Sequence, residues 1–141
     1  MRFWDTSALL PLFVAERAST RVRSWLRQDP TVLVWTLTRV EVLSALARRE
    51  REEPSAARAL LRARRQVLAA WEEWSEVVAL EAVRRQAERL VSVHPLRAAD
   101  ALQLGAALVA TDLEPAGVEL VTLDERLATA AEKEGFAVLG A

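Results

Sequence analysis

The chain of 141 residues has 18 arginines and one lysine, 20 acidic residues, one histidine, four glycines and no cysteine. Without cysteine there is no disulfide, no thiolate nucleophile and no zinc site with cysteine ligands, and one histidine excludes a multi-histidine metal site. The net charge of −1 favours neither nucleic acid nor membrane, while the length and the 52% hydrophobic content predict one globular domain over residues 1–141. The longest uncharged stretch, residues 101–111, is about half of a membrane-spanning helix, so we expect a cytoplasmic protein without membrane contact.

Short apolar strands alternate with amphipathic helices along the chain. The sequence predicts strands at 3–4, 32–35, 76–79, 119–122 and 136–139. It predicts helices at 6–15, 18–28, 38–51, 56–71, 81–91, 97–110 and 124–134. Because no hairpin signal separates the strands, we expect an α/β fold with a mainly parallel sheet.

The glycines exclude the common nucleotide sites of α/β proteins. A P-loop and a dinucleotide-binding turn need closely spaced glycines, whereas the four glycines here stand at positions 105, 117, 135 and 140. No G-x-S-x-G sequence is present for a hydrolase nucleophile. The only lysine, Lys133, lies in the last predicted helix, which excludes the late-sheet lysine of a phosphoacceptor receiver domain.

Four carboxylates stand where parallel α/β proteins bind ligands. Asp5 ends the first predicted strand, Asp124 follows the fourth, and Glu41 lies in the first turn of the helix after the second. The carboxyl ends of parallel strands meet at one edge of the sheet, so these three side chains should lie near one another. Asp100 interrupts the apolar face of the helix at 97–110, where a carboxylate needs a partner or a cation.

Each carboxylate also has a purely structural interpretation. Asp5 and Asp124 could cap the helices that follow them. Residues 38–41, with the sequence TRVE, fit the capping-box pattern S/T-x-x-E. Asp100 could form an ion pair with Arg97, three residues earlier on the same helix.

Together the four carboxylates predict a divalent metal site. Two unit charges about 5 Å apart repel by roughly 3 kcal/mol at an effective dielectric constant of about 20, so such a cluster needs protons or a cation. Because the ligands would all be oxygens, Mg²⁺ or Mn²⁺ is favoured over zinc. A metal there would lower the pKa of a bound water and neutralise charge developing on a phosphate.

The segments that carry these carboxylates resemble the four acidic motifs of PIN-domain ribonucleases, in particular the VapC-type toxins of bacterial and archaeal toxin–antitoxin pairs. They are FWDTSALL (3–10), TRVEV (38–42), LRAADAL (96–102) and VTLDERL (121–127), and they follow the order and spacing of the family. The resemblance covers positions 3 to about 138. It implies a three-layer α/β/α fold and a Mg²⁺- or Mn²⁺-dependent endoribonuclease.

The resemblance also implies roles for individual residues and partners. It assigns the metal and the positioning of the attacking water to the four carboxylates Asp5, Glu41, Asp100 and Asp124. It assigns supporting roles to the hydroxyl groups of Thr6, Ser7 and Thr122. It further implies a homodimer and inhibition by a small antitoxin protein whose C-terminal segment occupies the active-site groove.

Two arginine-rich segments predict contacts with RNA. Residues 14–28 hold four arginines and one acid, a local charge of +3, and residues 39–65 hold eight arginines and four glutamates, a local charge of +4. Arg58, Arg62 and Arg65 share one helix face and are predicted to bind RNA phosphates. A solvated helix face or a docking surface for an acidic partner remains an alternative, and His94 is expected to be a turn residue without a functional role.

Two other functions stay open at this point. A non-catalytic PIN-like module could bind RNA or protein, although such modules tend to lose the acidic quartet that this chain retains. A related nuclease for DNA flaps would need an additional helical arch, for which a chain of 141 residues leaves no room. The sequence therefore favours a metal-dependent endoribonuclease that serves as a toxin.

Overall fold

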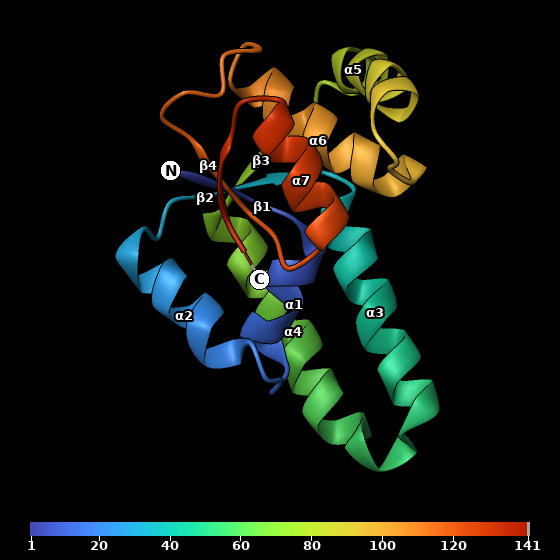
Figure 1. The fold of residues 1–141 in the computed structure, drawn as a ribbon. Coiled ribbons are helices and arrows are strands. Elements are labelled where there is room, and N and C mark those ends of the chain that lie inside the picture. Colours follow the sequence, from blue (N-terminus) through green and yellow to red (C-terminus); the bar gives the residue numbers. More distant parts are fainter. Residues whose placement is uncertain (141) are drawn as a thin grey trace.

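The computed structural model describes residues 1–140, in which a parallel sheet lies between two layers of helices (Figure 1). The strands are β1 (Arg2–Trp4), β2 (Val32–Trp35), β3 (Ser75–Val77), β4 (Glu119–Val121) and β5 (Ala137–Leu139). Their order is β3-β2-β1-β4-β5, and all pairings among the described residues are parallel. The predicted three-layer α/β/α fold is confirmed, and the sheet expected to be mainly parallel is parallel throughout.

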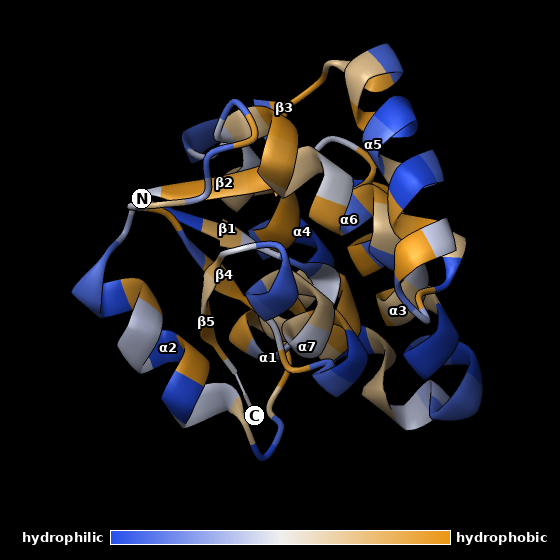
Figure 2. Ribbon diagram, turned by 45° about the horizontal axis from the view of Figure 1, so that its top comes forward, coloured by the Kyte–Doolittle hydropathy of each residue, from blue (hydrophilic) through white to orange (hydrophobic). Residues whose placement is uncertain are grey.

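Two groups of helices cover the two faces of the sheet. One face is covered by α1 (Thr6–Phe13), α2 (Ser19–Gln28), α3 (Thr38–Glu52) and α4 (Ala57–Glu73), with a 3-10 turn (Pro54–Ala56) between the last two. The other face is covered by α5 (Leu80–Val93), α6 (Ala98–Ala110) and α7 (Glu125–Lys133). Since neighbouring side chains of a strand point to opposite faces, Phe3 packs in the core with α5–α7 and Trp4 in the core with α1–α4. Figure 2 shows the resulting hydrophobic interior and hydrophilic outer surfaces.

Every predicted helix and strand is present in the described chain, and their ends differ from the prediction by at most two residues. The helix predicted at 6–15 ends at Phe13. Pro11 lies inside this helix, where it lacks the N–H that would continue the hydrogen-bond pattern. None of the helices of residues 1–140 is both long and apolar enough to cross a bilayer.

The strand order places β1 between β2 and β4 at the centre of the sheet. After β1 the chain moves to one side through β2 and β3, and it then returns to the other side of β1 for β4 and β5. At the carboxyl ends of the central pair, the backbone N–H of Asp5 donates a hydrogen bond to the carbonyl of Val121 (3.1 Å). Ligands of parallel sheets bind at such a reversal of strand order.

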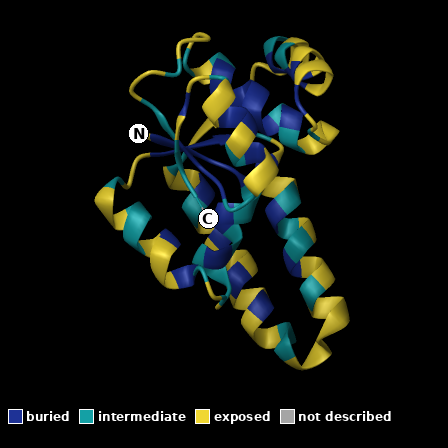
Figure 3. Ribbon diagram, in the orientation of Figure 1, coloured by how far each residue is buried: buried dark blue, intermediate teal, exposed yellow. Residues whose placement is uncertain are grey.

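Helices α3 and α4 form a long hairpin that extends well beyond the sheet and ends in an exposed tip (Figures 1 and 3). Its inner face is closed by buried side chains of Leu46, Leu60, Ala63 and Val67. The outer face of α4 carries the exposed Arg58, Arg62 and Arg65.

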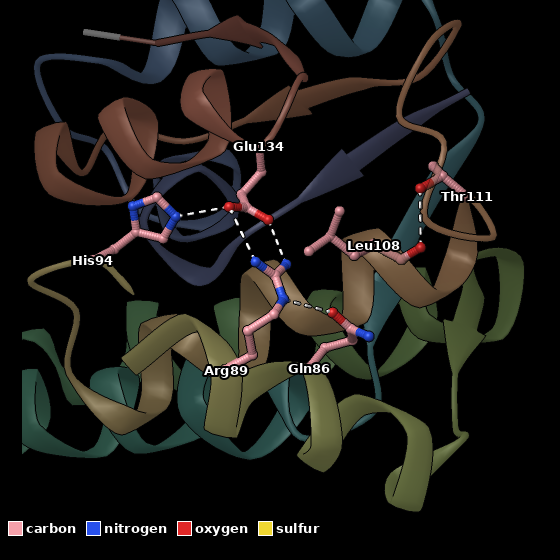
Figure 4. A network of polar contacts seen from close by, with 6 residues as sticks. All are labelled: Gln86, Arg89, His94, Leu108, Thr111 and Glu134. Carbon is pink, nitrogen blue, oxygen red and sulfur yellow. Dashed lines mark hydrogen bonds and ion pairs between the residues drawn. The ribbon is translucent and has the colours of Figure 1, made fainter. Parts of the chain in front are cut away.

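His94 connects the end of α5 to the end of α7 through a contact with Glu134 (Figure 4). It precedes Pro95 as predicted but is buried, and its Nε2 lies 2.8 Å from Oε2 of Glu134. Arg89 forms an ion pair with the same carboxylate. Arg89 and His94 together hold the pKa of Glu134 below its usual value. The histidine therefore has a structural place in the fold.

Candidate active site

One pocket of about 660 Å³ is lined by all four carboxylates singled out in the sequence. Asp5 and Asp124 immediately precede α1 and α7, at the ends of the central strands β1 and β4. Glu41 comes from the first turn of α3 and Asp100 from the first turn of α6. The starts of four helices, two on each face of the sheet, thus each place one acidic side chain where the strand order reverses.

Asp5 is both a helix cap and a buried member of this pocket. It is the N-cap of α1, where its Oδ1 accepts hydrogen bonds from Ser7 Oγ (2.7 Å) and from the N–H of Ala8 (3.4 Å). Its side chain is nevertheless only 3% exposed. Burial raises the pKa of Asp5 to about 7, and the nearby charge of Asp124 adds to this effect, although hydrogen bonds from Ser7 and Thr122 oppose it. A carboxyl group in a pocket whose pKa is raised in this way indicates a functional site and not only a helix cap.

Two hydroxyl groups connect the ends of β1 and β4. Ser7 Oγ lies 3.2 Å from Thr122 Oγ1 and accepts a hydrogen bond from the N–H of Leu123 (2.8 Å). Thr122 Oγ1 accepts one from the N–H of Asp124 (3.0 Å). The supporting hydroxyls of Ser7 and Thr122 therefore fix the backbone beside two of the four carboxylates.

Asp124 also caps a helix. Its Oδ1 accepts hydrogen bonds from the N–H groups of Arg126 (2.9 Å) and Leu127 (3.0 Å) at the start of α7. Both bonds use the same oxygen, so Oδ2 has no hydrogen bond within the described chain. The cap interpretation is correct for this residue, and the second oxygen remains available.

Glu41 does not take part in a capping box, so that interpretation is wrong. Helix α3 already includes Thr38, its N-cap is Leu37, and no side chain caps it. Instead, Glu41 Oε2 accepts a hydrogen bond from Thr6 Oγ1 (3.2 Å) and Oε1 accepts one from Gln103 Nε2 (3.2 Å). Burial raises the pKa of Glu41, and the charge of Asp100 raises it further.

Gln103 is the site residue that sequence reasoning missed. It is 2% exposed, and its Nε2 lies within hydrogen-bond distance of Thr38 Oγ1 (2.8 Å), Thr6 Oγ1 (3.2 Å) and Glu41. One buried amide thus ties α6 to α1 and α3, while its Oε1 is buried without a partner. The available signal was a glutamine one turn after Asp100 in an otherwise almost wholly apolar helix.

Asp100 does not form the ion pair with Arg97 that the sequence allowed. Within residues 1–140 its carboxylate makes no ion pair shorter than 4.0 Å. Burial and the charge of Asp124 raise its pKa, while Arg97 and Arg126 lower it from a distance. Asp100 is therefore a half-buried carboxylate that its own helix does not neutralise.

The donor set of this pocket fits a hard divalent cation in its chemistry. All four acidic side chains offer oxygen, and their charges act on one another, since Asp124 raises the pKa of Asp5 and Asp100 and Asp100 raises that of Glu41. In the part of the chain that the structure describes, however, no three acidic or histidine side chains lie close enough to form a ready-made metal site. A cation would have to draw these side chains closer together.

The predicted RNA-binding arginines lie apart from the carboxylates. Arg58, Arg62 and Arg65 are exposed on α4, and they do not line the acidic pocket. The arginine that does line this pocket is Arg48, from α3. Helical periodicity correctly predicted an exposed basic face but did not tell how far that face lies from the site.

Comparison with known proteins places the chain in a family. The model of the PIN domain matches residues 2–133, and no curated protein matches the chain. The crystal structure of PAE2754 from Pyrobaculum aerophilum is 23% identical with a TM-score of 0.62, over 97% of this chain and 81% of that one. The crystal structure of FitAcB from Neisseria gonorrhoeae is 16% identical with a TM-score of 0.65, over 99% and 96%. These two likenesses show the fold, and the match over nearly the whole length shows that the chain belongs to the PIN-domain family, whose members are generally nucleases.

Proposed function

We propose that this protein is a Mg²⁺- or Mn²⁺-dependent endoribonuclease that hydrolyses RNA phosphodiester bonds. The observation that carries the proposal is that Asp5, Glu41, Asp100 and Asp124 line one pocket at the strand-order reversal of a PIN domain. These four carboxylates are the proposed catalytic residues and metal ligands. A divalent cation bound there would lower the pKa of a water molecule and neutralise charge on the phosphate.

The side chains around the carboxylates would orient them before substrate arrives. Ser7 and Thr122 hold the ends of β1 and β4, and Thr6 donates a hydrogen bond to Glu41. Asp100 accepts no hydrogen bond within the described residues, so its two oxygens are available to a metal ion and to the attacking water.

We further propose that the protein is the toxin of a type II toxin–antitoxin pair, of the VapC type, and that it acts in the cytoplasm as a homodimer. A small antitoxin protein would inhibit it by occupying the pocket. The exposed Arg58, Arg62 and Arg65 would contact RNA phosphates or the acidic surface of such a partner. The PIN-domain match and the acidic pocket support the nuclease activity of such a toxin, and the resemblance of the four acidic motifs to VapC-type toxins supports the homodimer and the antitoxin partner.

The test is RNA cleavage by the purified, antitoxin-free protein in Mn²⁺ and in EDTA. We expect cleavage only with the metal, and we expect Asp5→Asn and Asp100→Asn to abolish it while the circular dichroism spectrum stays unchanged. Asp112→Asn is the matched control, because Asp112 is exposed in the loop after α6 and does not line the pocket. No cleavage with Mn²⁺, or full activity of Asp100→Asn, would refute the proposal.

The alternative is a non-catalytic PIN-like module that binds RNA or protein. Such a module would bind RNA without cleaving it, and Asp100→Asn would leave its effect on cell growth unchanged. The retained acidic pocket favours the enzyme, because a binding module has no need for a carboxylate cluster in which Asp124 raises the pKa of Asp5 and Asp100, and Asp100 raises that of Glu41.

A further inference from the structure

Three arginines to which no role has yet been assigned stand beside the carboxylates. Arg48 lines the acidic pocket from α3. Arg97 and Arg126 line a second hollow of about 500 Å³. The two hollows share Ala99, Asp100 and Asp124, so they are parts of one continuous groove with an arginine from α3 in one part and two arginines in the other.

These three arginines are free cations. All three are exposed, and within residues 1–140 none forms an ion pair shorter than 4.0 Å. Other arginines of the chain are committed to carboxylates, as Arg49 is to Glu16 and Arg89 to Glu134. The guanidinium groups in the groove are therefore available to a ligand.

Their positions in the elements explain why they accompany the acids. Arg48 lies seven residues after Glu41 on α3, which places both on one face of that helix. Arg97 is the N-cap of α6, three residues before Asp100, and Arg126 follows Asp124 in the first turn of α7. The charges of Arg97 and Arg126 reach Asp100 without forming a contact pair with it.

The two parts of the groove share acidic side chains, and each part also has at least one unpaired arginine. This arrangement favours the binding of an extended polyanion. The acids repel any phosphate that is not accompanied by a cation, so a chain of phosphates gains affinity only where arginines can hold it. A compact monoanion would need no second group of arginines. The backbone of a nucleic acid supplies phosphates at regular intervals, before and after the one that lies over the carboxylates.

We propose that Arg48 on one side, and Arg97 with Arg126 on the other, bind the RNA phosphates that flank the scissile phosphodiester. This inference rests on the proposed ribonuclease function. It gives the substrate a path across the site, along α3 and then over the starts of α6 and α7. The arginines on α4 would then add affinity only farther from the point of cleavage.

The experiment measures RNA binding in EDTA, where no metal supports cleavage. A fluorescently labelled single-stranded RNA of about 12 nucleotides is titrated with Arg48→Gln, Arg97→Gln, Arg126→Gln and the wild type, followed by fluorescence anisotropy. A charge-assisted hydrogen bond predicts about a tenfold loss of affinity for each variant. Between about 50 and 200 mM salt, the slope of log K against log salt should become shallower by about 0.7 for each lost phosphate contact.

Arg85→Gln is the matched control. Arg85 is exposed on α5, forms no ion pair in the described chain and lines a different hollow. We expect its RNA affinity and salt slope to equal those of the wild type. All four arginines are exposed, so thermal melts should show unchanged folding.

Two results would overturn the inference in different ways. If the three groove variants bind RNA as the wild type does but bind Mn²⁺ more tightly, the arginines only neutralise the carboxylates and the phosphate sites do not exist. In that case the wild type still cleaves RNA in Mn²⁺ and the proposed function stands. If the wild type neither binds nor cleaves RNA, the proposed function fails and the inference fails with it.

Discussion

The hydroxyl of Ser7 lies 3.2 Å from the hydroxyl of Thr122, which joins the residues that follow β1 to those that follow β4. Ser7 also donates to Asp5 and accepts from the N–H of Leu123. This single side chain therefore links the ends of two central strands, through a contact between residues 115 apart in sequence, and it also binds one of the proposed metal ligands.

Ser7→Ala should destabilise the protein by about 1–3 kcal/mol, because it removes one hydrogen bond from the buried carboxylate of Asp5 and leaves the N–H of Leu123 without a partner. Chemical denaturation of both proteins at one pH measures the difference in the free energy of unfolding. Ser92→Ala is the control, since Ser92 is exposed and bonds only to a carbonyl of its own helix. Equal stability of Ser7→Ala and wild type would show that the hydroxyl link contributes nothing.

The buried carboxyl of Asp5 makes stability depend on pH. Its pKa rises from 3.8 to about 7 on folding, so the folded protein holds this proton more tightly than the unfolded chain does. The stabilisation is complete below pH 3.8 and is lost as the pH rises to about 7. Asparagine keeps the N-cap and carries no charge, so Asp5→Asn should be more stable than wild type at pH 8 by up to about 4 kcal/mol.

Urea unfolding at pH 5 and pH 8 in EDTA tests this effect, and the advantage of Asp5→Asn should be much smaller at the lower pH. Asp112→Asn provides the control for an exposed aspartate. If Asp5→Asn is less stable than the wild type by the same amount at both values of pH, burial does not raise the pKa of the Asp5 carboxyl.

A divalent cation should reverse the loss of stability that ionisation of Asp5 causes at high pH. Mn²⁺ at about 100 times its dissociation constant would stabilise a folded site by about 2.7 kcal/mol. We expect the melting temperature of the wild type to rise with Mn²⁺ at pH 8 and that of Asp100→Asn to rise less, because one oxygen ligand is lost. Equal shifts for the wild type, Asp100→Asn and Asp112→Asn would mean that the metal binds elsewhere.

The helices and strands of the fold were predictable because the sequence patterns that specify them are local. The strand at 32–35 was predicted with its correct ends, since its four apolar residues are all buried between the two helical layers. Asp5 and Asp124 were found because the carboxyl end of a strand in a parallel sheet has a known place. The sequence alone therefore located the edge of the sheet that holds the acidic pocket.

The environment of Glu41 was not predictable in the same way. The pattern of residues 38–41 fits a capping box, but Thr38 bonds to Gln103, which is 65 residues away in sequence. A local pattern cannot reveal a partner from another layer of the fold. For the same reason the exposed arginines of α4 could be recognised as a basic face, whereas the position of Arg48 beside the acids became clear only from the structure.

Glu134 is expected to matter for stability and not for cleavage. Its carboxylate joins Arg89 and His94 at the ends of α5 and α7 (Figure 4), and none of these three residues lines the acidic pocket. Glu134→Gln should lower the free energy of unfolding by about 1–3 kcal/mol, because it weakens two charge-assisted hydrogen bonds. Denaturation and RNA cleavage at a temperature well below unfolding measure the two properties, and a loss of cleavage without loss of stability would contradict this division.

Gln103 should act on catalysis through Glu41. Its amide donates a hydrogen bond to Glu41 Oε1, and the hydroxyl of Thr6 donates one to Glu41 Oε2. Gln103→Leu would therefore leave Oε1 of this carboxylate without a hydrogen bond. Loss of a residue that orients a metal ligand typically lowers metal affinity or activity about 10- to 100-fold. We therefore expect a lower kcat and a higher Mn²⁺ concentration at half-maximal activity, with little change in KM for RNA.

Leucine fits the buried position in size, so the folded state of Gln103→Leu should persist, and its melting curve checks this. Gln66→Leu is the control, because Gln66 is exposed on α4. A purely structural role would lower the melting temperature and leave the Mn²⁺ requirement of the remaining folded enzyme unchanged. A shift of the Mn²⁺ requirement in a stably folded variant would instead identify Gln103 as the residue that positions Glu41.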